Sequence, residues 1–140
     1  MELLEGETLH QLIHREAPLD PVRAIDIARQ IASALAEAHE AGIVHRDLKP
    51  ANVFLCQHGE ESGFVKVMDF GLVKELGKDS DLSHAGTVLG SPMYMSPEQS
   101  RGDEVDARCD IYAVGLIMYT MIVGRPAFKA SNALAVLLAH

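Results

Sequence analysis

The chain has 140 residues, of which 48% are hydrophobic and 23% charged, a balance typical of a folded domain rather than a disordered segment. Its net charge of −8 and the lack of a Lys/Arg cluster argue against nucleic acid as a partner, because phosphate binding needs a basic face. The longest apolar run, residues 111–123, is too short to cross a bilayer, so we expect no membrane segment.

The first third of the chain predicts two helices. Thr8 can cap a short helix that runs through Ile13. Asp20 is a good N-cap for a longer helix, and Gly42 can end it. An apolar stripe with helical spacing predicts the buried face of the longer helix: Ile25, Ala28, Ile31, Ala32, Leu35 and Ala38.

The rest of the chain predicts a hairpin, a long loop and a buried helix. Residues 53–55 and 64–67 read as two short strands joined by a polar connection with two glycines, which indicates a β-hairpin. Residues 69–98 are rich in Gly, Ser and Pro and predict a long functional loop. Residues 106–123 predict a nearly all-apolar buried helix.

The predicted hairpin brings two polar residues together. Antiparallel strands return the chain beside its starting point, so Asp69 is expected near Asn52. A carboxylate and an amide oxygen are hard donors that suit Mg²⁺. The sequence therefore predicts a magnesium site formed by these two residues.

Three segments carry a family resemblance in their order along the chain. Residues 45–52 read HRDLKPAN, residues 69–71 read DFG, and residues 90–99 read GSPMYMSPEQ. Together they resemble eukaryotic-type (Hanks-type) serine/threonine protein kinases, and the residues YMSPEQ of the third segment are most similar to bacterial members. The resemblance implies an α+β, mainly α, protein kinase-like fold. We expect an incomplete C-terminal lobe with a small β-hairpin and a long activation segment.

The resemblance assigns the chemistry to a few residues. Asp47 would receive or orient the proton of the substrate hydroxyl, and Lys49 would meet the transferred phosphate. Asn52 and Asp69 would bind Mg²⁺, which acts with ATP in this family. The nucleotide would contact four residues at the hinge, the ribose and the adenine floor: Glu2, Leu4, Glu5 and Phe54.

The resemblance also implies regulatory positions. Thr87 and Ser83 would be candidates for an activating phosphate in the activation segment. Arg46 and Lys74 could pair with that charge. An unmodified loop threonine explains Thr87 equally well. Ser91 stands where family members carry a threonine that contacts the catalytic Asp and Lys, and would help to dock the substrate.

Five further positions would be structural by the same resemblance. His45 and Phe70 would stack, and Gly71 would let the backbone turn. Asp110 would accept N–H bonds from the catalytic loop, which would offset the cost of burying it. Glu98 would pair with a later arginine that these 140 residues lack.

Three functions account for some or all of these residues. A serine/threonine protein kinase, using ATP and Mg²⁺ to phosphorylate Ser or Thr hydroxyls of proteins, explains all of them. A small-molecule phosphotransferase shares the HxDxxxxN loop but gives no reason for Lys49 or the SPE triplet. A non-catalytic kinase-like binding module leaves Asp47 and Asn52 unexplained.

The 140 residues contain no glycine-rich loop and no partner for the nucleotide phosphates of the kind that a β3 lysine supplies. We therefore expect residues 1–140 to be a partial kinase domain, from the hinge through most of the C-lobe, with both ends artificial. Such a chain should be marginally stable and transfer little phosphate by itself.

The cysteines and histidines suggest no structural metal. Cys56 and Cys109 stand apart without a CxxC motif, which predicts reduced thiols and a cytoplasmic location. Six of the seven histidines have no spacing that would hold a metal, and we read them as surface or satisfied polar residues.

Overall fold

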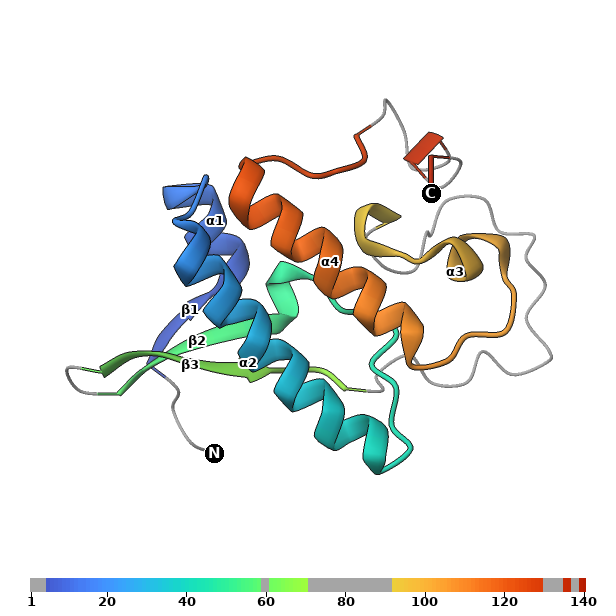
Figure 1. Cartoon of the computed structure of the whole chain (residues 1–140), viewed down its shortest axis with the longest axis horizontal. Coiled ribbons are helices and arrows are strands. Elements are labelled where there is room, and N and C mark those ends of the chain that lie inside the picture. Colours follow the sequence, from blue (N-terminus) through green and yellow to red (C-terminus); the bar gives the residue numbers. More distant parts are fainter. Residues whose placement is uncertain (1–4, 59–60, 71–91, 130–134, 137–138) are drawn as a thin grey trace.

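The structure is a computed structural model that describes residues 5–58, 61–70, 92–129, 135–136 and 139–140. Within these residues it contains a three-stranded antiparallel sheet and several helices (Figure 1). The elements follow one another in this order: β1 (Gly6–Thr8), α1 (Leu9–Glu16), α2 (Pro21–Glu40), the 3₁₀ turn η1 (Pro50–Asn52), β2 (Val53–His58), β3 (Glu61–Val67), the 3₁₀ turn η2 (Pro92–Tyr94), α3 (Pro97–Arg101) and α4 (Arg108–Val123).

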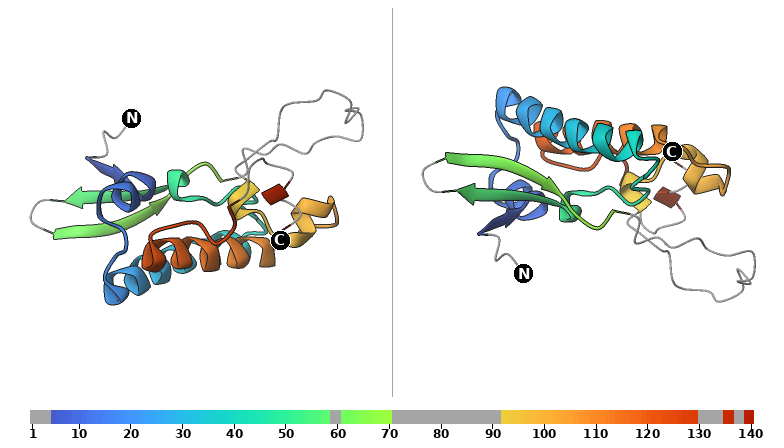
Figure 2. Two further views of the ribbon diagram at one scale, coloured as in Figure 1. Left: turned by 90° about the horizontal axis from the view of Figure 1, so that it is seen from above. Right: turned by 90° about the horizontal axis from the view of Figure 1, so that it is seen from below.

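The sheet and the two long helices form two layers (Figure 2). The strands lie in the order β1-β2-β3, and α2 packs against both β3 and α4. The strands β2 and β3 confirm the predicted hairpin, although each is longer than the sequence indicated. No helix in the described part of the chain is long and apolar enough to span a membrane.

The helix caps are those that the sequence predicted. The Thr8 hydroxyl accepts a hydrogen bond from the backbone N–H of Gln11, whose side-chain oxygen accepts one from the N–H of Thr8. The Asp20 carboxylate accepts hydrogen bonds from the N–H groups of Val22 and Arg23. Gly42 follows α2 with a φ of 76°, the left-handed conformation that ends many helices.

The predicted apolar stripe of α2 was partly wrong. Ile25 is 53% exposed and Ala32 is also exposed, whereas Ala24 and Ile27 are buried. Two overlapping rows of apolar residues run along this helix, and packing against β3 and α4 decides which row is covered. The buried positions are Ala24, Ile27, Ala28, Ile31 and Leu35.

Two elements were not predicted. Gly6–Thr8 forms β1 by pairing with β2, with Gly6 opposite Cys56. A Cβ at Gly6 would lie 2.1 Å from the carbonyl oxygen of Leu55, so only glycine permits this close approach. The helix α3 begins at Pro97, near the end of the stretch 69–98 that the sequence predicted as a loop, and α4 begins at Arg108, two residues later than predicted.

One hydrophobic core joins α1, α2, α4 and the sheet. Its fully buried members include Leu12, Ile31, Val53 and Ile117, and burial of such side chains contributes about 1.5–3 kcal/mol each. Val53 directly follows η1, so the core fixes one end of the loop that precedes it. The other end of that loop is held by α4.

Candidate active site

A buried carboxylate at the start of α4 binds the backbone at the start of the loop of residues 45–52. Asp110 is 1% exposed, and its two oxygens accept hydrogen bonds from the backbone N–H groups of His45 and Arg46, each at 2.9 Å. His39, near the end of α2, lies with Nε2 2.8 Å from the same carboxylate. These partners offset the cost of burying the charge. In this structure, Asp110 therefore accepts the N–H bonds from the loop that the resemblance implied.

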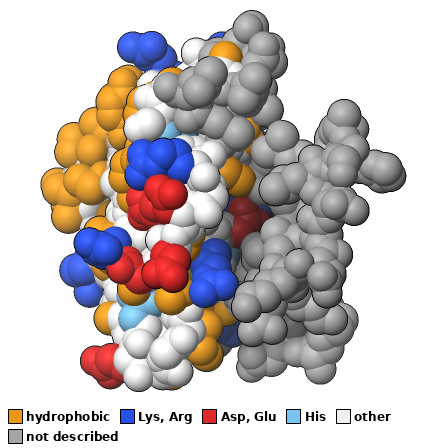
Figure 3. Space-filling view, turned by 90° about the vertical axis from the view of Figure 1, so that its right-hand side faces the viewer, with side chains coloured by type: hydrophobic (Ala, Val, Ile, Leu, Met, Phe, Trp, Pro, Cys, Tyr) orange, Lys and Arg blue, Asp and Glu red, His pale blue; other side chains and the backbone are white. Residues whose placement is uncertain are grey.

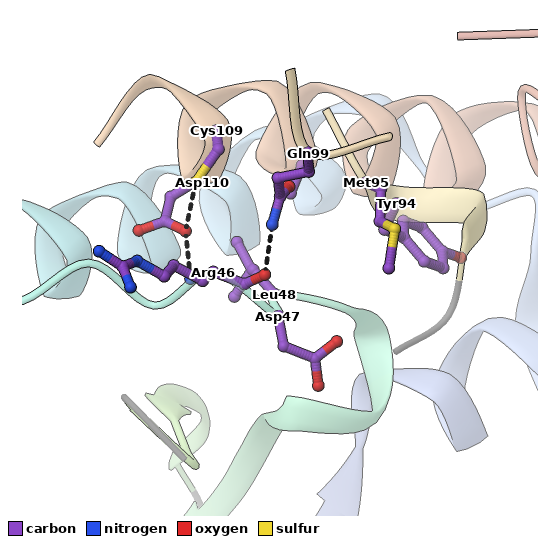
Figure 4. A pocket seen from close by; sticks show the side chains of 9 residues that line it. Arg46, Asp47, Leu48, Tyr94, Met95, Gln99, Cys109 and Asp110 are labelled. Atoms are coloured by element: carbon purple, nitrogen blue, oxygen red, sulfur yellow. Dashed lines mark hydrogen bonds between the residues drawn. The ribbon is translucent and has the colours of Figure 1, made fainter. Parts of the chain in front are cut away.

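The backbone of Arg46 is strained and held on both sides (Figure 4). Its φ of 65° is rare for a residue with a side chain. Besides the bond to Asp110, its carbonyl oxygen accepts a hydrogen bond from Nε2 of Gln99 in α3 at 2.6 Å. Figure 4 shows Asp110 facing this backbone and the Asp47 side chain pointing to the opposite side, away from α4. The strained peptide therefore turns Asp47 outward.

His45 connects the loop to the segment that follows β3. Its Nδ1 lies 3.3 Å from the N–H of Asp47 and accepts from it, which leaves Nε2 as the nitrogen that donates to the Met68 carbonyl at 2.8 Å. The His45 ring also lies 4.9 Å from the ring of Phe70, and the two rings are tilted by 56° rather than stacked in parallel. The loop and the start of the DFG triplet are thereby held together.

A carboxylate and an ammonium group form an ion pair on the side of the loop that faces away from α4. The Lys49 ammonium lies 2.7 Å from a carboxylate oxygen of Asp47, and their side chains are 26% and 29% exposed. The amide nitrogen of Asn52 donates to the carbonyl oxygen of Asp47 at 2.9 Å, which fixes the spacing of the loop. Because the side chains of Asp47 and Lys49 are partly exposed, a bound ligand can contact both charged groups.

The expected metal ligands lie at neighbouring backbone positions. The N–H of Met68 donates to the carbonyl oxygen of Asn52 at 2.8 Å, and Asp69 follows Met68 with an exposed side chain. The Asn52 amide nitrogen donates its hydrogen bond within the loop, so its oxygen is the atom that would bind a metal ion. One carboxylate and one amide oxygen fit Mg²⁺, which takes few protein ligands. The described residues hold no group of three or more His, Cys, Asp or Glu for another kind of metal site.

The structure describes some of the remaining predicted site residues and leaves others outside its described ranges. Phe54 is half-buried in β2 opposite Thr8, Glu5 is exposed before β1, and Glu98 is half-buried in α3. Glu98 makes no ion pair with any residue that the structure describes. Seven predicted residues lie outside the described part of the chain: Glu2, Leu4, Gly71, Lys74, Ser83, Thr87 and Ser91.

Two residues that hold the loop were missed by sequence reasoning. Gln99 also completes a capping box with Ser96, and the S-x-x-Q spacing could have predicted the start of α3. Nothing in the sequence indicates that Gln99 reaches Arg46. His39 was read as one of the satisfied polar histidines, yet its partner Asp110 lies 71 residues away and leaves no local signal.

A buried thiol adjoins the anchor without taking part in the site. Burial, with the nearby charge of Asp110, raises the pKa of Cys109 to about 12. The Cys109 thiol lies 3.5 Å from a carboxylate oxygen of Asp110 and donates a weak hydrogen bond to it. Cys109 therefore stays protonated at neutral pH and is a poor nucleophile.

Charged side chains of both signs are intermixed on the surface shown in Figure 3. Near α3, Arg101 lies 2.8 Å from Asp103 and Arg108 lies 2.9 Å from Asp106, all largely exposed. Such pairs cancel locally, so the described residues around α3 offer no uniformly positive area to an extended polyanion.

Comparison with known proteins gives matches along the whole chain. The pattern of the family described as "Protein kinase domain" matches residues 1–138. The serine/threonine-protein kinase pkn3 of Myxococcus xanthus is 45% identical over 143 residues, covering 100% of this chain and 26% of that protein. PknB of Mycobacterium leprae is 38% identical over 140 residues, and a Streptomyces coelicolor probable serine/threonine-protein kinase is 41% identical over 141. The chain spans only about a quarter of these relatives at most.

Proposed function

Because this chain belongs to the protein kinase domain family, with bacterial serine/threonine kinases among its relatives, we propose that the natural protein is a serine/threonine protein kinase. It transfers the γ-phosphate of ATP to Ser or Thr hydroxyls of protein substrates. The relatives support this by name, and the described site supports it by chemistry.

One observation carries the proposal. Asp47 and Lys49 form an accessible pair at 2.7 Å, on a loop whose backbone is bound at both ends by Asp110 and Asn52. An aligned acceptor for a proton and a cation for a phosphate are the groups that phosphoryl transfer to a hydroxyl requires. Positioning them rigidly lowers the barrier, because this reaction depends mainly on alignment and electrostatic stabilisation.

Each group has a defined task in the transfer. The hydroxyl oxygen of the acceptor forms a bond to the γ-phosphorus while the bond from that phosphorus to the bridging oxygen breaks and ADP leaves. Asp47 orients the hydroxyl and takes its proton. Lys49 stabilises the negative charge on the moving phosphoryl oxygens. Release of Lys49 from Asp47 toward the phosphate leaves Asp47 able to accept the proton.

Asn52 and Asp69 are proposed to hold Mg²⁺. Bound Mg²⁺ would neutralise charge on the nucleotide phosphates. Asn52 presents its amide oxygen because the amide nitrogen is bound to the Asp47 carbonyl. Phe54, with Glu5 and the backbone of Glu2 and Leu4, is proposed to contact the adenine and ribose. Residues 1–140 would correspond to the part of a kinase domain from the hinge to about helix αG.

The regulatory assignments are part of the same proposal. Thr87 or Ser83 would receive an activating phosphate, and Arg46 with Lys74 would pair with it. Ser91 would contact the catalytic pair when the substrate docks. Arg46 supports this idea because its side chain is exposed while its backbone is fixed in the loop. Replacing Thr87 by alanine should lower activity, and unchanged activity would exclude a role for its phosphate.

The test is phosphorylation by the purified natural polypeptide that contains this chain. We expect Mg-ATP to label peptides with Ser or Thr acceptors and not those with Tyr. The Asp47→Asn variant should lower kcat by about 10²–10⁴-fold, because it removes the proton acceptor. Asp103→Asn, at an exposed carboxylate paired with Arg101, is the control and should keep full activity.

Two results would contradict the proposal. One is a natural polypeptide that binds Mg-ATP but labels no peptide or protein acceptor, which would favour a binding module. The other is an Asp47→Asn variant as active as the Asp103→Asn control.

A further inference from the structure

A groove of about 440 Å³ opens beside the catalytic loop. Lys49 lines it, together with residues of α1, of η2 and of the end of α4. None of the nucleotide-side residues Asn52, Phe54 and Asp69 lines it. The groove therefore adjoins the proposed acceptor position without belonging to the proposed nucleotide site.

The charge of the groove is opposite to that of the chain. The sequence has 20 acidic and 12 Lys or Arg residues, yet none of the Asp and Glu residues that the structure describes lines the groove. The polar lining is basic or neutral, with His10 and His14 from α1 and Arg125 after α4. Arg125 is exposed and makes no ion pair with any residue that the structure describes. A cation without a partner beside a catalytic loop favours an anionic ligand.

Two residues with hydroxyl groups, Tyr94 and Thr120, line the groove. Thr120 is 4% exposed and donates its hydroxyl hydrogen to the Leu116 carbonyl at 2.8 Å, which fixes the orientation of the side chain. Burial raises the pKa of the Tyr94 phenol, an effect that the neighbouring Thr120 hydroxyl reduces. Tyr94 therefore remains a neutral hydrogen-bond donor. Both side chains are polar and uncharged, so this part of the lining does not repel a negatively charged group.

We propose that this groove binds an acidic side chain of the protein substrate, close in sequence to the phosphorylated residue, with Arg125 as the main specificity-determining residue. The inference rests on the proposed function, since Lys49 would face the acceptor. An extended peptide advances about 3.3–3.6 Å per residue, so a groove that begins at Lys49 takes a side chain within about three residues of the acceptor. The Arg125 guanidinium forms paired hydrogen bonds with a carboxylate.

The experiment measures kcat/KM of the natural polypeptide for a series of peptides. A single Glu replaces Gln at each of about three positions on either side of the acceptor. At one or two adjacent positions we expect Glu to raise kcat/KM about two- to fivefold, the range of a partly exposed ion pair. The Arg125→Glu variant should abolish this preference and favour Lys at the same position.

Lys129→Glu is the matched control. It makes the same change of charge four residues later, at an exposed side chain that does not line the groove. The control should keep the preference for Glu. If Lys129→Glu lost the preference as fully as Arg125→Glu, a general charge effect would explain the data and the groove assignment would be wrong.

A binding measurement separates this inference from the proposed function. Fluorescent peptides with Ala at the acceptor position cannot be phosphorylated, and their anisotropy reports binding alone. Tighter binding of the Glu peptide, lost in Arg125→Glu, supports the groove even if no peptide is phosphorylated. Equal kcat/KM and equal binding for Glu and Gln peptides at every position would overturn the inference while leaving the kinase proposal intact.

Discussion

The carboxylates on the two sides of the loop of residues 45–52 differ in their exposure and in their partners. On the α4 side, Asp110 is 1% exposed and its partners are two backbone N–H groups and His39. On the outer side, Asp47 is 29% exposed and pairs with Lys49, while Asp69 is exposed. The buried carboxylate fixes the backbone, and the exposed ones remain available for substrate and metal. Stability and the proposed chemistry thus depend on different carboxylates around one loop.

The largest predicted effect removes the buried carboxylate. Asp110→Ala should lower the free energy of unfolding by about 3–5 kcal/mol, because it leaves two loop N–H groups and His39 without their acceptor. Urea unfolding of the natural protein, followed by a probe in this domain, measures the change. The exposed Asp103→Ala should cost less than about 1 kcal/mol. Equal losses in both variants would contradict the contrast between the two faces.

A smaller effect is expected at the contact between α3 and the loop. Gln99→Glu keeps the oxygen that caps α3 but replaces the amide N–H that donates to the Arg46 carbonyl. We expect a loss of about 1 kcal/mol and a lower kcat, because the strained Arg46 backbone is released.

Ser100→Ala is the control for Gln99→Glu. Its hydroxyl bonds to the Pro97 carbonyl within α3 and does not contact the loop. Thermal unfolding and kcat are compared in both variants. The proposed link from α3 to the catalytic loop fails if Gln99→Glu lowers kcat no more than Ser100→Ala.

The two cysteines should differ in reactivity. The pKa of Cys109 is raised from an ordinary value of 9.0 to about 12, so the folded protein should leave this thiol unmodified by iodoacetamide at about pH 8. The half-buried Cys56 should react first. Because the folded pKa is raised, this thiol's contribution to stability is present below pH 9.0 and is lost as the pH rises toward 12. Peptide mapping by mass spectrometry distinguishes the two sites, and equal labelling would contradict the burial of Cys109.

The smallest effect concerns a surface carboxylate. The Arg108 side chain lowers the pKa of Asp106 below its ordinary value of 3.8. The stabilisation from this pair is therefore present above pH 3.8 and is lost as the pH falls through the folded pKa. Carboxyl ¹³C NMR titration should show a low pKa that returns toward 3.8 in Arg108→Gln. An unchanged titration in that variant would show that the pair does not persist in solution.

Local signals in the sequence predicted the parts of the fold that local chemistry determines. Thr8 and Asp20 are the N-caps of α1 and α2, and the two strand-like runs at residues 53–55 and 64–67 belong to a hairpin. The choice between Ile25 and Ile27 as a buried residue could not be made, because both lie on apolar rows of one helix. The short strand β1 has only three residues, two of which, Gly6 and Glu7, are of types that are depleted in strands, and it pairs with β2.

The candidate site was predicted through its motif rather than through its supports. The motif at residues 45–52 contains Asp47, Lys49 and Asn52. The hairpin explains why the residue before Asp69 lies beside Asn52. The contacts of Gln99 and His39 join segments 53 and 71 residues apart, respectively, and no spacing rule specifies such pairs. The groove around Arg125 is likewise assembled from four separate segments, so its charge is invisible in the linear sequence.

The bond between Asp110 and the loop also sets an order of events during synthesis. His45 leaves the ribosome 65 residues before the carboxylate that holds it, an interval of about 3–13 s at ordinary translation rates. Until then the N–H group of the left-handed Arg46 backbone lacks its acceptor, so we expect that a nascent chain does not hold Asp47 in its final orientation. Ribosome-bound chains that stop before and after Asp110 has emerged should differ in hydrogen exchange at His45. We therefore expect the loop of residues 45–52 to reach its final conformation only after the start of α4 has been synthesised.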